Sequence, residues 1–521
     1  MQRKQQSEST DAVTAVVEQP SKQRKIAETV PSATLYAGQF LLGPREIDVQ
    51  PKWRRHSVAG NLVLSTHPDL CVFQVSSDDL RRQLTLVGEM LDPHAPELGN
   101  EGILRSLISR FATRSDLLKA TTPLGGRWVL IGQNGTEVFL FHDALGLRQV
   151  FHTAGGSTNE LWAMSQPGIG IEVLGLGIDP DAAAFMDSFA FRSHLEYRWP
   201  GTASPLKGLN RLLPNHSLDL NTGRVERYWP VDPLVRVSSV DAVDRLAKVL
   251  PGLVDAISRR HRVALSLTAG IDSRLVLAAA RDFTDRIDFV TVRQTRMPDD
   301  HADIVVPSQL LARLQLPHDI VRASATMSPD FARYFKRNVF FAHDHYGADA
   351  EAVRRYSGGT RVALTGSGAE VGRCPFRNEI SNSSLMQIDS FQLARLQRMG
   401  NELFAVKNFN GWLVDARARF DVKLLDLFDW EQGHGSWLAM TQLEFDTAWR
   451  DIFTPYNSRE VLTTLLGVEE SQRRSPRYRI FRTLIARLWP ELLQAPINPM
   501  SRKARARTLV RKLLSQARFW Y

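Results

Sequence analysis

The sequence predicts an α/β protein: an N-terminal, antiparallel, β-rich α+β domain, followed by a parallel-sheet α/β domain whose C-terminal part is helical. Three observations lead to this fold class. Short apolar or alternating runs, separated by turn residues, fill the first half of the chain, as they do in antiparallel sheets. Strand-like and helix-like segments alternate after residue 240, which favours a parallel sheet covered by helices. The length of 521 residues is also more than a single hydrophobic core usually supports.

In the first half of the chain, the sequence predicts strands, one helix and two hairpins. Strands are expected in four apolar runs, at 40–44, 61–67, 70–75 and 84–91. The segment 100–114 has the apolar spacing of a helix. A hairpin is expected within 126–153, because Asn134 and Gly135 lie between two apolar runs and this dipeptide favours a tight turn. Residues 214–231 predict a second hairpin.

The second half alternates between helix and strand. The expected elements are a helix at 241–260, a strand at 263–267, a helix at 272–282, a strand at 287–292 and a helix at 302–316. Beyond residue 325 the pattern is mainly helical, with one more strand at 361–366. Alternation of this kind is typical of βαβ units and predicts that the strands are parallel.

Shifts in composition divide the chain into four segments. Residues 1–34 are rich in Gln, Ser, Glu and Lys and contain no aromatic residue, so they are expected to be a disordered leader. Residues 35–234 contain the antiparallel pattern, and residues 235–496 contain the alternating pattern. Residues 497–521 hold seven Lys or Arg and no acid, which predicts a basic helix or tail.

The net charge of +9 is concentrated in this tail, which leaves only +2 for the other 496 residues. A nucleic-acid partner is therefore not expected, although the tail could make a weak contact with a membrane surface or a partner protein. The sequence contains no run of about 18 apolar residues, so a membrane span is not expected. Neither a secretory signal nor a disulfide framework is visible, since Cys71 and Cys374 stand far apart, so a cytoplasmic location is expected.

The most informative segment is the loop between the strand at 263–267 and the following helix. Thr268, Ala269 and Gly270 are small, so the backbone can approach a ligand closely, and the N–H groups at the start of the helix favour an anion. Asp272 beside such an anion site would be explained by a bound cation such as Mg²⁺. An ordinary helix cap formed by Asp272 or Ser273 explains the same residues about equally well.

This loop, T-A-G-I-D-S, resembles the S-G-G-x-D-S pyrophosphate loop of the ATP pyrophosphatases, in particular the asparagine synthetase family. In that family the loop binds the β- and γ-phosphates of ATP while a substrate carboxylate attacks the α-phosphate, and an amine then displaces AMP. The resemblance implies that ATP is bound by Leu267, Thr268, Ala269, Gly270, Ile271, Asp272, Ser273 and Val292.

A second segment, A-L-T-G-S-G-A-E-V at 363–371, is similar to the S-G-x-G-x-D-E segment of the same family. The resemblance implies that Thr365 and Gly366 contact ATP, and that Glu370 acts in catalysis and holds Mg²⁺ together with Asp272. Two carboxylates that bind a metal beside pyrophosphate would help to neutralise the leaving group. Ser367 stands where the family has an acid–base glutamate. Lys503 is the nearest candidate for the family's phosphate-binding lysine.

The N-terminal half resembles the family's glutaminase domain, which has an Ntn-hydrolase-like fold. The resemblance rests on the hairpin of 126–153 and on the D-x-x-G-x-R segment formed by Asp143, Gly146 and Arg148. The glutaminase requires a cysteine as residue 2, but residue 2 here is Gln, so glutamine hydrolysis by that route is not expected. β-Lactam synthetases and lasso-peptide cyclases are relatives that also lack this cysteine.

The predicted function is therefore an asparagine-synthetase-like, ATP-dependent, amide-forming ligase that requires ATP and Mg²⁺. Its partners would be a small-molecule or peptide carboxylate and an amine donor. Two alternatives remain open: a peptide or lactam cyclase that uses an amine of its own substrate, and a catalytically decayed binding protein on the same fold, which Ser367 would explain.

Overall fold

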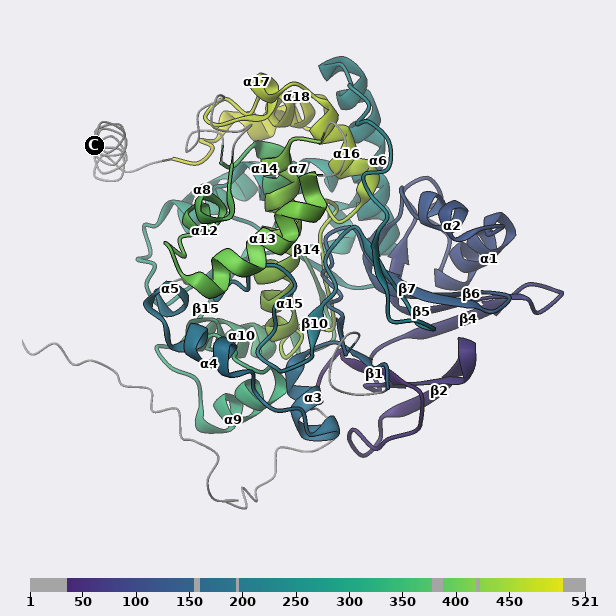
Figure 1. The fold of residues 1–521 in the computed structure, drawn as a ribbon. Coiled ribbons are helices and arrows are strands. Elements are labelled where there is room, and N and C mark those ends of the chain that lie inside the picture. Colours follow the sequence, from purple (N-terminus) through teal and green to yellow (C-terminus); the bar gives the residue numbers. More distant parts are fainter. Residues whose placement is uncertain (1–34, 154–159, 194–195, 377–387, 418–421, 500–521) are drawn as a thin grey trace, which may run out of the picture.

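A computed structural model of the chain describes residues 35–153, 160–193, 196–376, 388–417 and 422–499. It confirms the predicted fold class: antiparallel sheets come first, a parallel sheet follows, and the C-terminal part is helical (Figure 1). The predicted leader, 1–34, and most of the basic tail, 500–521, lie outside the described residues. No helix in the described part of the chain is long and apolar enough to cross a bilayer.

Two six-stranded antiparallel sheets form the N-terminal part. The first has the order β10-β8-β9-β1-β3-β2, and its strands are β1 (Phe40–Gly43), β2 (Arg54–Val58), β3 (Leu62–Thr66), β8 (Phe151–His152), β9 (Ala163–Met164) and β10 (Asn210–Arg211). The second has the order β12-β11-β7-β6-β5-β4, and its strands are β4 (Val72–Ser76), β5 (Arg82–Leu91), β6 (Gly125–Asn134), β7 (Glu137–His142), β11 (His216–Asp219) and β12 (Val225–Arg227).

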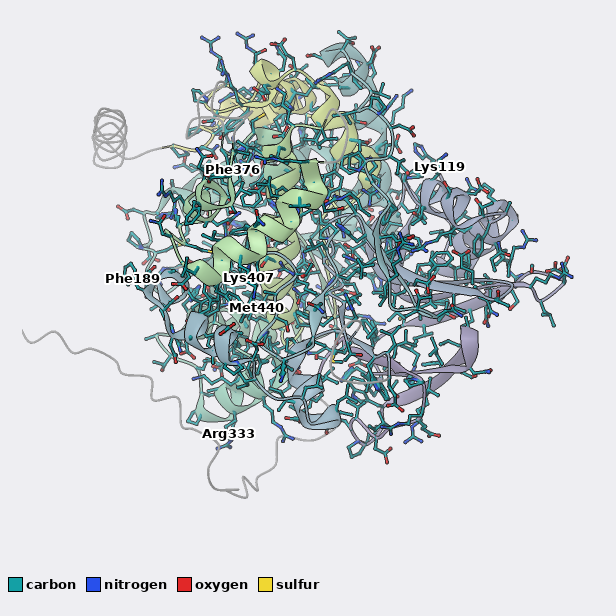
Figure 2. All side chains as sticks on the ribbon, in the orientation of Figure 1. Lys119, Phe189, Arg333, Phe376, Lys407 and Met440 are labelled. Atoms are coloured by element: carbon teal, nitrogen blue, oxygen red, sulfur yellow. The ribbon has the colours of Figure 1, made fainter. Side chains whose placement is uncertain are left out.

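The alternation of side chains explains how the two sheets pack. Residues on the inner faces of both sheets form one apolar cluster, which includes Leu42, Leu64, Val129, Ile131 and Leu140. The outer face of the second sheet packs against α1 (Asn100–Arg110) and α2 (Arg114–Ala120), which lie outside it in Figure 1. The helices α3 (Pro167–Leu174), α4 (Pro180–Asp187) and α5 (Phe189–Arg192) connect β9 to β10. Phe189 of α5 is 85% exposed and lies at the edge of the molecule (Figure 2).

The second part is built on a five-stranded sheet of order β15-β14-β13-β16-β17, in which every pair of neighbours is parallel. Its strands are β13 (Val263–Ser266), β14 (Ile287–Arg293), β15 (Asp319–Arg322), β16 (Val362–Leu364) and β17 (Ile452–Phe453). Because β13 and β16 are adjacent and parallel, the loops that follow them leave the sheet at the same edge. These are the two loops that carry the sequence motifs.

Helices cover both faces of the parallel sheet. One face packs against α6 (Ser239–Arg260), α7 (Ile271–Ala279), α8 (Ala302–Arg313), α16 (Arg459–Gly467) and α18 (Arg479–Leu488). The other face packs against α9 (Pro329–Asn338) and α10 (Asp344–Ser357), together with residues of the first antiparallel sheet. The remaining helical segments are α12 (Ser390–Leu396), α13 (Leu403–Arg417), α14 (Leu424–Phe428), η5 (Asp429–Leu438), α15 (Ala439–Phe445) and α17 (Glu470–Arg473), with the short turns η2 (Ala59–Asn61), η3 (Arg281–Arg286), η4 (Ala369–Arg373) and η6 (Pro490–Gln494).

Most elements expected from apolar patterns are present, with shifted ends. Both predicted hairpins are confirmed, although the tight turn is Gly135–Thr136, one residue later than expected. The helix expected at 100–114 ends at Arg110, and α2 begins after a capping box at Thr113. The predicted boundary at residue 235 falls between β12 and α6, and the domain limits stay predictions.

Four charged residues, three of them buried and one half-buried, join the antiparallel part to the parallel part. Arg127 makes two contacts with Asp446, of 2.5 and 2.8 Å, and one with Asp451, of 2.9 Å. Arg148 contacts the other oxygen of Asp451 at 2.5 Å and also donates to the Gly38 carbonyl. Both arginines are at most 2% exposed. Charges removed from water in this way are tolerated only when they are paired, so this cluster ties the two parts of the chain together.

The substitution Asp451→Asn tests this interface. It leaves Arg127 and Arg148 buried with one carboxylate fewer, and the expected loss of unfolding free energy in urea is about 3–5 kcal/mol. Asp299→Asn is a matched control, because Asp299 also contacts two arginines but is 71% exposed, and this variant should unfold much as wild type does. Equal losses for the two variants would contradict the account.

Candidate functional site

The first loop connects the end of β13 to the start of α7 and is held by its own side chains. The hydroxyl of Ser273 accepts the Thr268 N–H at 3.2 Å and lies 3.1 Å from the Thr268 hydroxyl. The Gly270 N–H donates to the Thr268 hydroxyl at 3.1 Å. The helix then begins at Ile271, with Gly270 in the capping position but with no side-chain cap. The alternative of an ordinary Asp or Ser cap is therefore not what the geometry shows.

Two residues far along the chain complete this loop. An oxygen of Asp303, at the start of α8, accepts the Ala269 N–H at 2.9 Å. The Asn498 N–H donates to the Ala269 carbonyl at 2.9 Å, which brings the C-terminal segment against the loop. An anion that approached the loop N–H groups would compete with the Asp303 carboxylate for one of them.

The second loop follows β16 and packs directly against the first turn of α7. A methyl group added at Gly366 would lie only 2.5 Å from the Ser273 nitrogen and 2.7 Å from the Asp272 carbonyl carbon. Gly368 has φ of +94°, which favours glycine, and its added methyl group would meet Leu145 of the antiparallel part at 2.6 Å. The backbone contact therefore requires glycine at 366, and the positive φ favours glycine at 368.

These contacts bring Asp272 and Glu370 to the same place, as the sequence predicts for them. One guanidinium lies between the two carboxylates: Arg373 Nη1 is 2.9 Å from Asp272 Oδ2, and Arg373 Nη2 is 3.0 Å from Glu370 Oε1. Glu370 Oε2 also accepts the Gly368 N–H at 3.0 Å. The other oxygen of Asp272, Oδ1, is buried and has no hydrogen-bond partner among the described residues. The same holds for the Thr365 hydroxyl.

A histidine that the sequence analysis did not single out completes the cluster. His434 Nε2 is 3.3 Å from Glu370 Oε2, and His434 Nδ1 is 3.3 Å from Asp429 Oδ2. Asp429 and His434 belong to η5, which has π-helical hydrogen bonding, and this spacing places residues five apart on one face. Such π-helical turns are frequent at functional sites.

The electrostatic environment separates the pKa values of the two carboxylates. Burial raises the pKa of Asp272 to about 7, although Arg373 opposes the shift. Burial also favours a raised pKa for Glu370, but the hydrogen bond from His434 and the charge of Arg373 outweigh it and lower the pKa to about 2. For His434, burial alone would lower the pKa, whereas Asp429 and Glu370 together raise it to about 10.

A cavity of about 470 Å³ opens beside this cluster, with a volume typical of a small-molecule pocket. Glu370, Asp429 and His434 form part of its wall. The other lining residues are Ser193, Glu196, Arg198, Pro375, Phe376, Leu396, Arg398 and Trp437. Figure 2 locates Phe376 in the helical C-terminal part of the molecule. The mixture of both charges with aromatic side chains fits a polar ligand.

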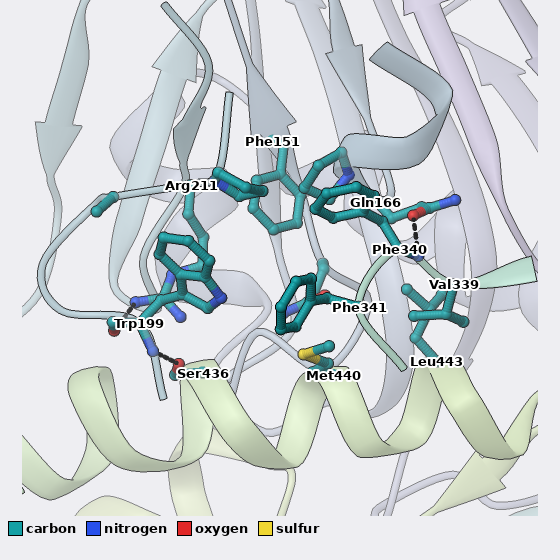
Figure 3. Close-up of a pocket in the computed structure, with 14 residues that line it drawn as sticks. Phe151, Gln166, Trp199, Arg211, Val339, Phe340, Phe341, Ser436, Met440 and Leu443 are labelled. Atoms are coloured by element: carbon teal, nitrogen blue, oxygen red, sulfur yellow. Dashed lines mark hydrogen bonds between the residues drawn. The ribbon is translucent and has the colours of Figure 1, made fainter. Parts of the chain in front are cut away.

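A second cavity, between the antiparallel part and the helix that carries Ser436, is much smaller. It measures about 30 Å³ and is lined mainly by aromatic and aliphatic side chains such as Phe151, Phe341 and Met440 (Figure 3). Some of its polar groups are bonded within the protein: Gln166 accepts the Phe340 N–H at 3.0 Å, and the Ser436 hydroxyl accepts the Trp199 N–H at 3.2 Å. This volume holds a water molecule or two but not a substrate.

The other predicted site residues have different surroundings. Leu267 and Ile271 are buried and Val292 is half-buried, all beside the first loop. Ser367 is half-buried, and its carbonyl accepts the Thr454 hydroxyl at 2.7 Å. Lys503 lies outside the described residues. His343 Nδ1, which the sequence gives no site role, lies 2.6 Å from Glu444 Oε1.

Comparison with known proteins gives only a distant likeness. No family model and no curated protein matches the sequence. One similar solved structure is described as the allosteric regulatory enzyme of purine biosynthesis, with 11% identity and a TM-score of 0.25 over 65% of this chain and 72% of that one. Another is the glutamine phosphoribosylpyrophosphate amidotransferase from B. subtilis complexed with ADP and GMP, with 11% identity and a TM-score of 0.20 over 66% and 72%. The resemblance to the asparagine synthetase family therefore stays a prediction.

The substitution Gly366→Ala tests the contact between the two loops. The added methyl group cannot be accommodated without moving the backbone at Asp272 and Ser273, so the expected loss of unfolding free energy is about 1–3 kcal/mol in urea denaturation. Gly411→Ala is the control, because nothing lies within 4 Å of the added group and α13 is helical there, so this variant should be as stable as wild type or slightly more so. A neutral Gly366→Ala variant would contradict the contact.

The raised pKa of His434 predicts how stability depends on pH. Because its pKa is higher in the folded protein, about 10 against 6.5, its contribution to stability is complete below pH 6.5 and disappears as the pH rises towards 10. The stability difference between wild type and His434→Gln should therefore shrink between pH 7 and pH 10, as measured by urea unfolding. A difference that stays constant or grows over this range would show that the imidazolium is not stabilised by Asp429 and Glu370.

Proposed function

We propose that the chain is an ATP-dependent, amide-forming ligase that adenylates a substrate carboxylate at the edge of its parallel sheet. The observation that carries the proposal is a pair of buried oxygens on the two motif loops, Asp272 Oδ1 and the Thr365 hydroxyl, for which the described residues supply no hydrogen-bond partner. Buried polar groups in folded proteins are nearly always hydrogen-bonded to protein, water or ligand, so two such atoms on neighbouring loops leave room for a bound partner there.

The position of these atoms supports a nucleotide as that ligand. They lie at the carboxyl edge of a parallel sheet, where open α/β sheets bind their ligands. The start of α7 offers a positive helix terminus beside them, which favours phosphate groups. The adjoining cavity of about 470 Å³ is large enough for the carboxylate substrate.

The proposed reaction has two steps. An oxygen of the substrate carboxylate bonds to the α-phosphorus of ATP while the bond from that phosphorus to the β-phosphate bridging oxygen breaks, which releases pyrophosphate. An amine nitrogen then bonds to the acyl carbon while its bond to the AMP oxygen breaks, and the nitrogen loses one proton. In this scheme the residues of 268–273, with Thr365 and Gly366, bind the phosphates and hold them in line for the first step.

Asp272 and Glu370 are the residues for which the resemblance implies a bound Mg²⁺. Three of the four oxygens of Asp272 and Glu370 are already bound to Arg373, His434 or a backbone N–H, and Asp272 Oδ1 alone has no partner within the part of the chain that the structure describes. Mg²⁺ requires near-octahedral coordination by oxygen, so this arrangement does not fit a protein-held ion. No step above relies on a metal, and its ligation by Asp272 and Glu370 stays a prediction.

The proposal is tested by carboxylate-dependent exchange of pyrophosphate into ATP, with pools of amino acids and dicarboxylic acids as probes. Wild type is expected to catalyse exchange with at least one pool, and Asp272→Asn to reduce the rate by at least about 100-fold, because the Asp272 carboxylate holds the Arg373 guanidinium beside the phosphates. Asp282→Asn, on the exposed turn η3, is the control and should keep the wild-type rate. Absence of exchange with every pool, together with absence of ATP binding, would refute the ligase.

A further inference from the structure

Arg373 occupies the space between the two carboxylates for which the resemblance implies a metal ion. Its two terminal nitrogens contact different carboxylates, at 2.9 Å to Asp272 and 3.0 Å to Glu370. A guanidinium that bridges two carboxylates in this way neutralises their mutual repulsion, which is also what a divalent cation would do there. The side chain of Arg373 is 17% exposed, so the contacts are partly shielded from water and salt.

The position of Arg373 follows from the local structure. It lies three residues after Glu370 in the 3₁₀ turn η4, where residues three apart stand on the same side. The face of the Tyr478 ring lies 5.6 Å from the guanidinium carbon, a distance at which an aromatic ring attracts a cation. The preceding residue is also fixed, because Arg473 donates to the Gly372 carbonyl at 3.3 Å. Arg373 is therefore directed to the carboxylates by several contacts.

The remaining oxygens do not offer an alternative metal site. Glu370 Oε2 is engaged by the Gly368 N–H and by His434, so Asp272 Oδ1 is the single carboxylate oxygen of this pair without a hydrogen-bond partner among the described residues. No group of three or more His, Cys, Asp or Glu side chains in the described ranges is arranged to hold a metal. A divalent ion held by both carboxylates would have to displace the guanidinium.

We propose that Arg373 is the resident cation of the Asp272–Glu370 pair, and that the nucleotide-free protein binds no divalent cation there. The inference rests on the geometry of three side chains and is independent of the proposed ligase activity. A guanidinium has five N–H donors, of which these contacts use two, so Arg373 also keeps donors for a phosphate oxygen that enters the site. Removing the guanidinium should expose a pair of carboxylates that can bind a metal.

Binding of Mn²⁺ to the full-length, nucleotide-free chain, followed by electron paramagnetic resonance, tests the proposal. Wild type should show no Mn²⁺ site that depends on Asp272. Arg373→Met removes the charge but keeps a long side chain, and it should create one Mn²⁺ site at least about tenfold tighter than any in wild type, because affinity follows the charge of the ligands. The double variant Arg373→Met/Asp272→Asn should lose that site. Arg477→Met, at an exposed position, is the matched control and should behave as wild type.

Two results would overturn the proposal. One is a Mn²⁺ site in wild type that Asp272→Asn abolishes, since the cation position would then be open in the presence of Arg373. The other is a folded Arg373→Met variant that gains no Mn²⁺ site. If Arg373→Met does not fold, Mn²⁺ binding by wild type and by Asp272→Asn still tests the proposal. Arg373→Gln then provides a second neutral variant. None of these readouts depends on ATP turnover, so loss of the ligase proposal would leave the result intact.

Discussion

The candidate site depends on one close approach: the bare Cα of Gly366 against the first turn of α7. β13 and β16 are neighbours in the parallel sheet, so their loops leave it at one edge, but adjacency alone does not bring the loops into contact. A side chain at Gly366 would collide with the Ser273 nitrogen. Because this position is glycine, the second loop lies directly on the first, and Glu370 comes within reach of the same guanidinium as Asp272.

The antiparallel part supports this arrangement although it contributes none of the clustered charges. Asp143 accepts the N–H groups of Trp128, Leu147 and Arg148 and so fixes a buried turn. From that turn, Leu145 packs against Gly368, and its N–H donates to Asn457, which also binds the Gly126 carbonyl. The motif that resembles a glutaminase segment thus positions the second loop.

Elements with strong apolar patterns could be predicted from the sequence, and elements fixed by long-range contacts could not. The hairpins and the helix at 241–260 follow from alternation and from helical spacing. β2 was missed because Arg54–Val58 is polar and mostly exposed, and β17 was missed because two residues carry no pattern. At the site, the two motif loops could be identified because their sequences resemble motifs of the asparagine synthetase family. Asp429 and His434 could not be found in this way, since only π-helical spacing aligns them, and Arg373 has no motif that marks it.

The central claim is that the loops after β13 and β16 form a nucleotide site. A crystal structure of the protein with the non-reacting analogue α,β-methylene-ATP tests it most directly. The account predicts that the triphosphate lies along residues 268–273, with phosphate oxygens accepting from N–H groups at the start of α7 and the Thr365 hydroxyl bonded to the ligand. A nucleotide bound elsewhere with these loops unchanged, or no binding at millimolar concentration, would contradict it.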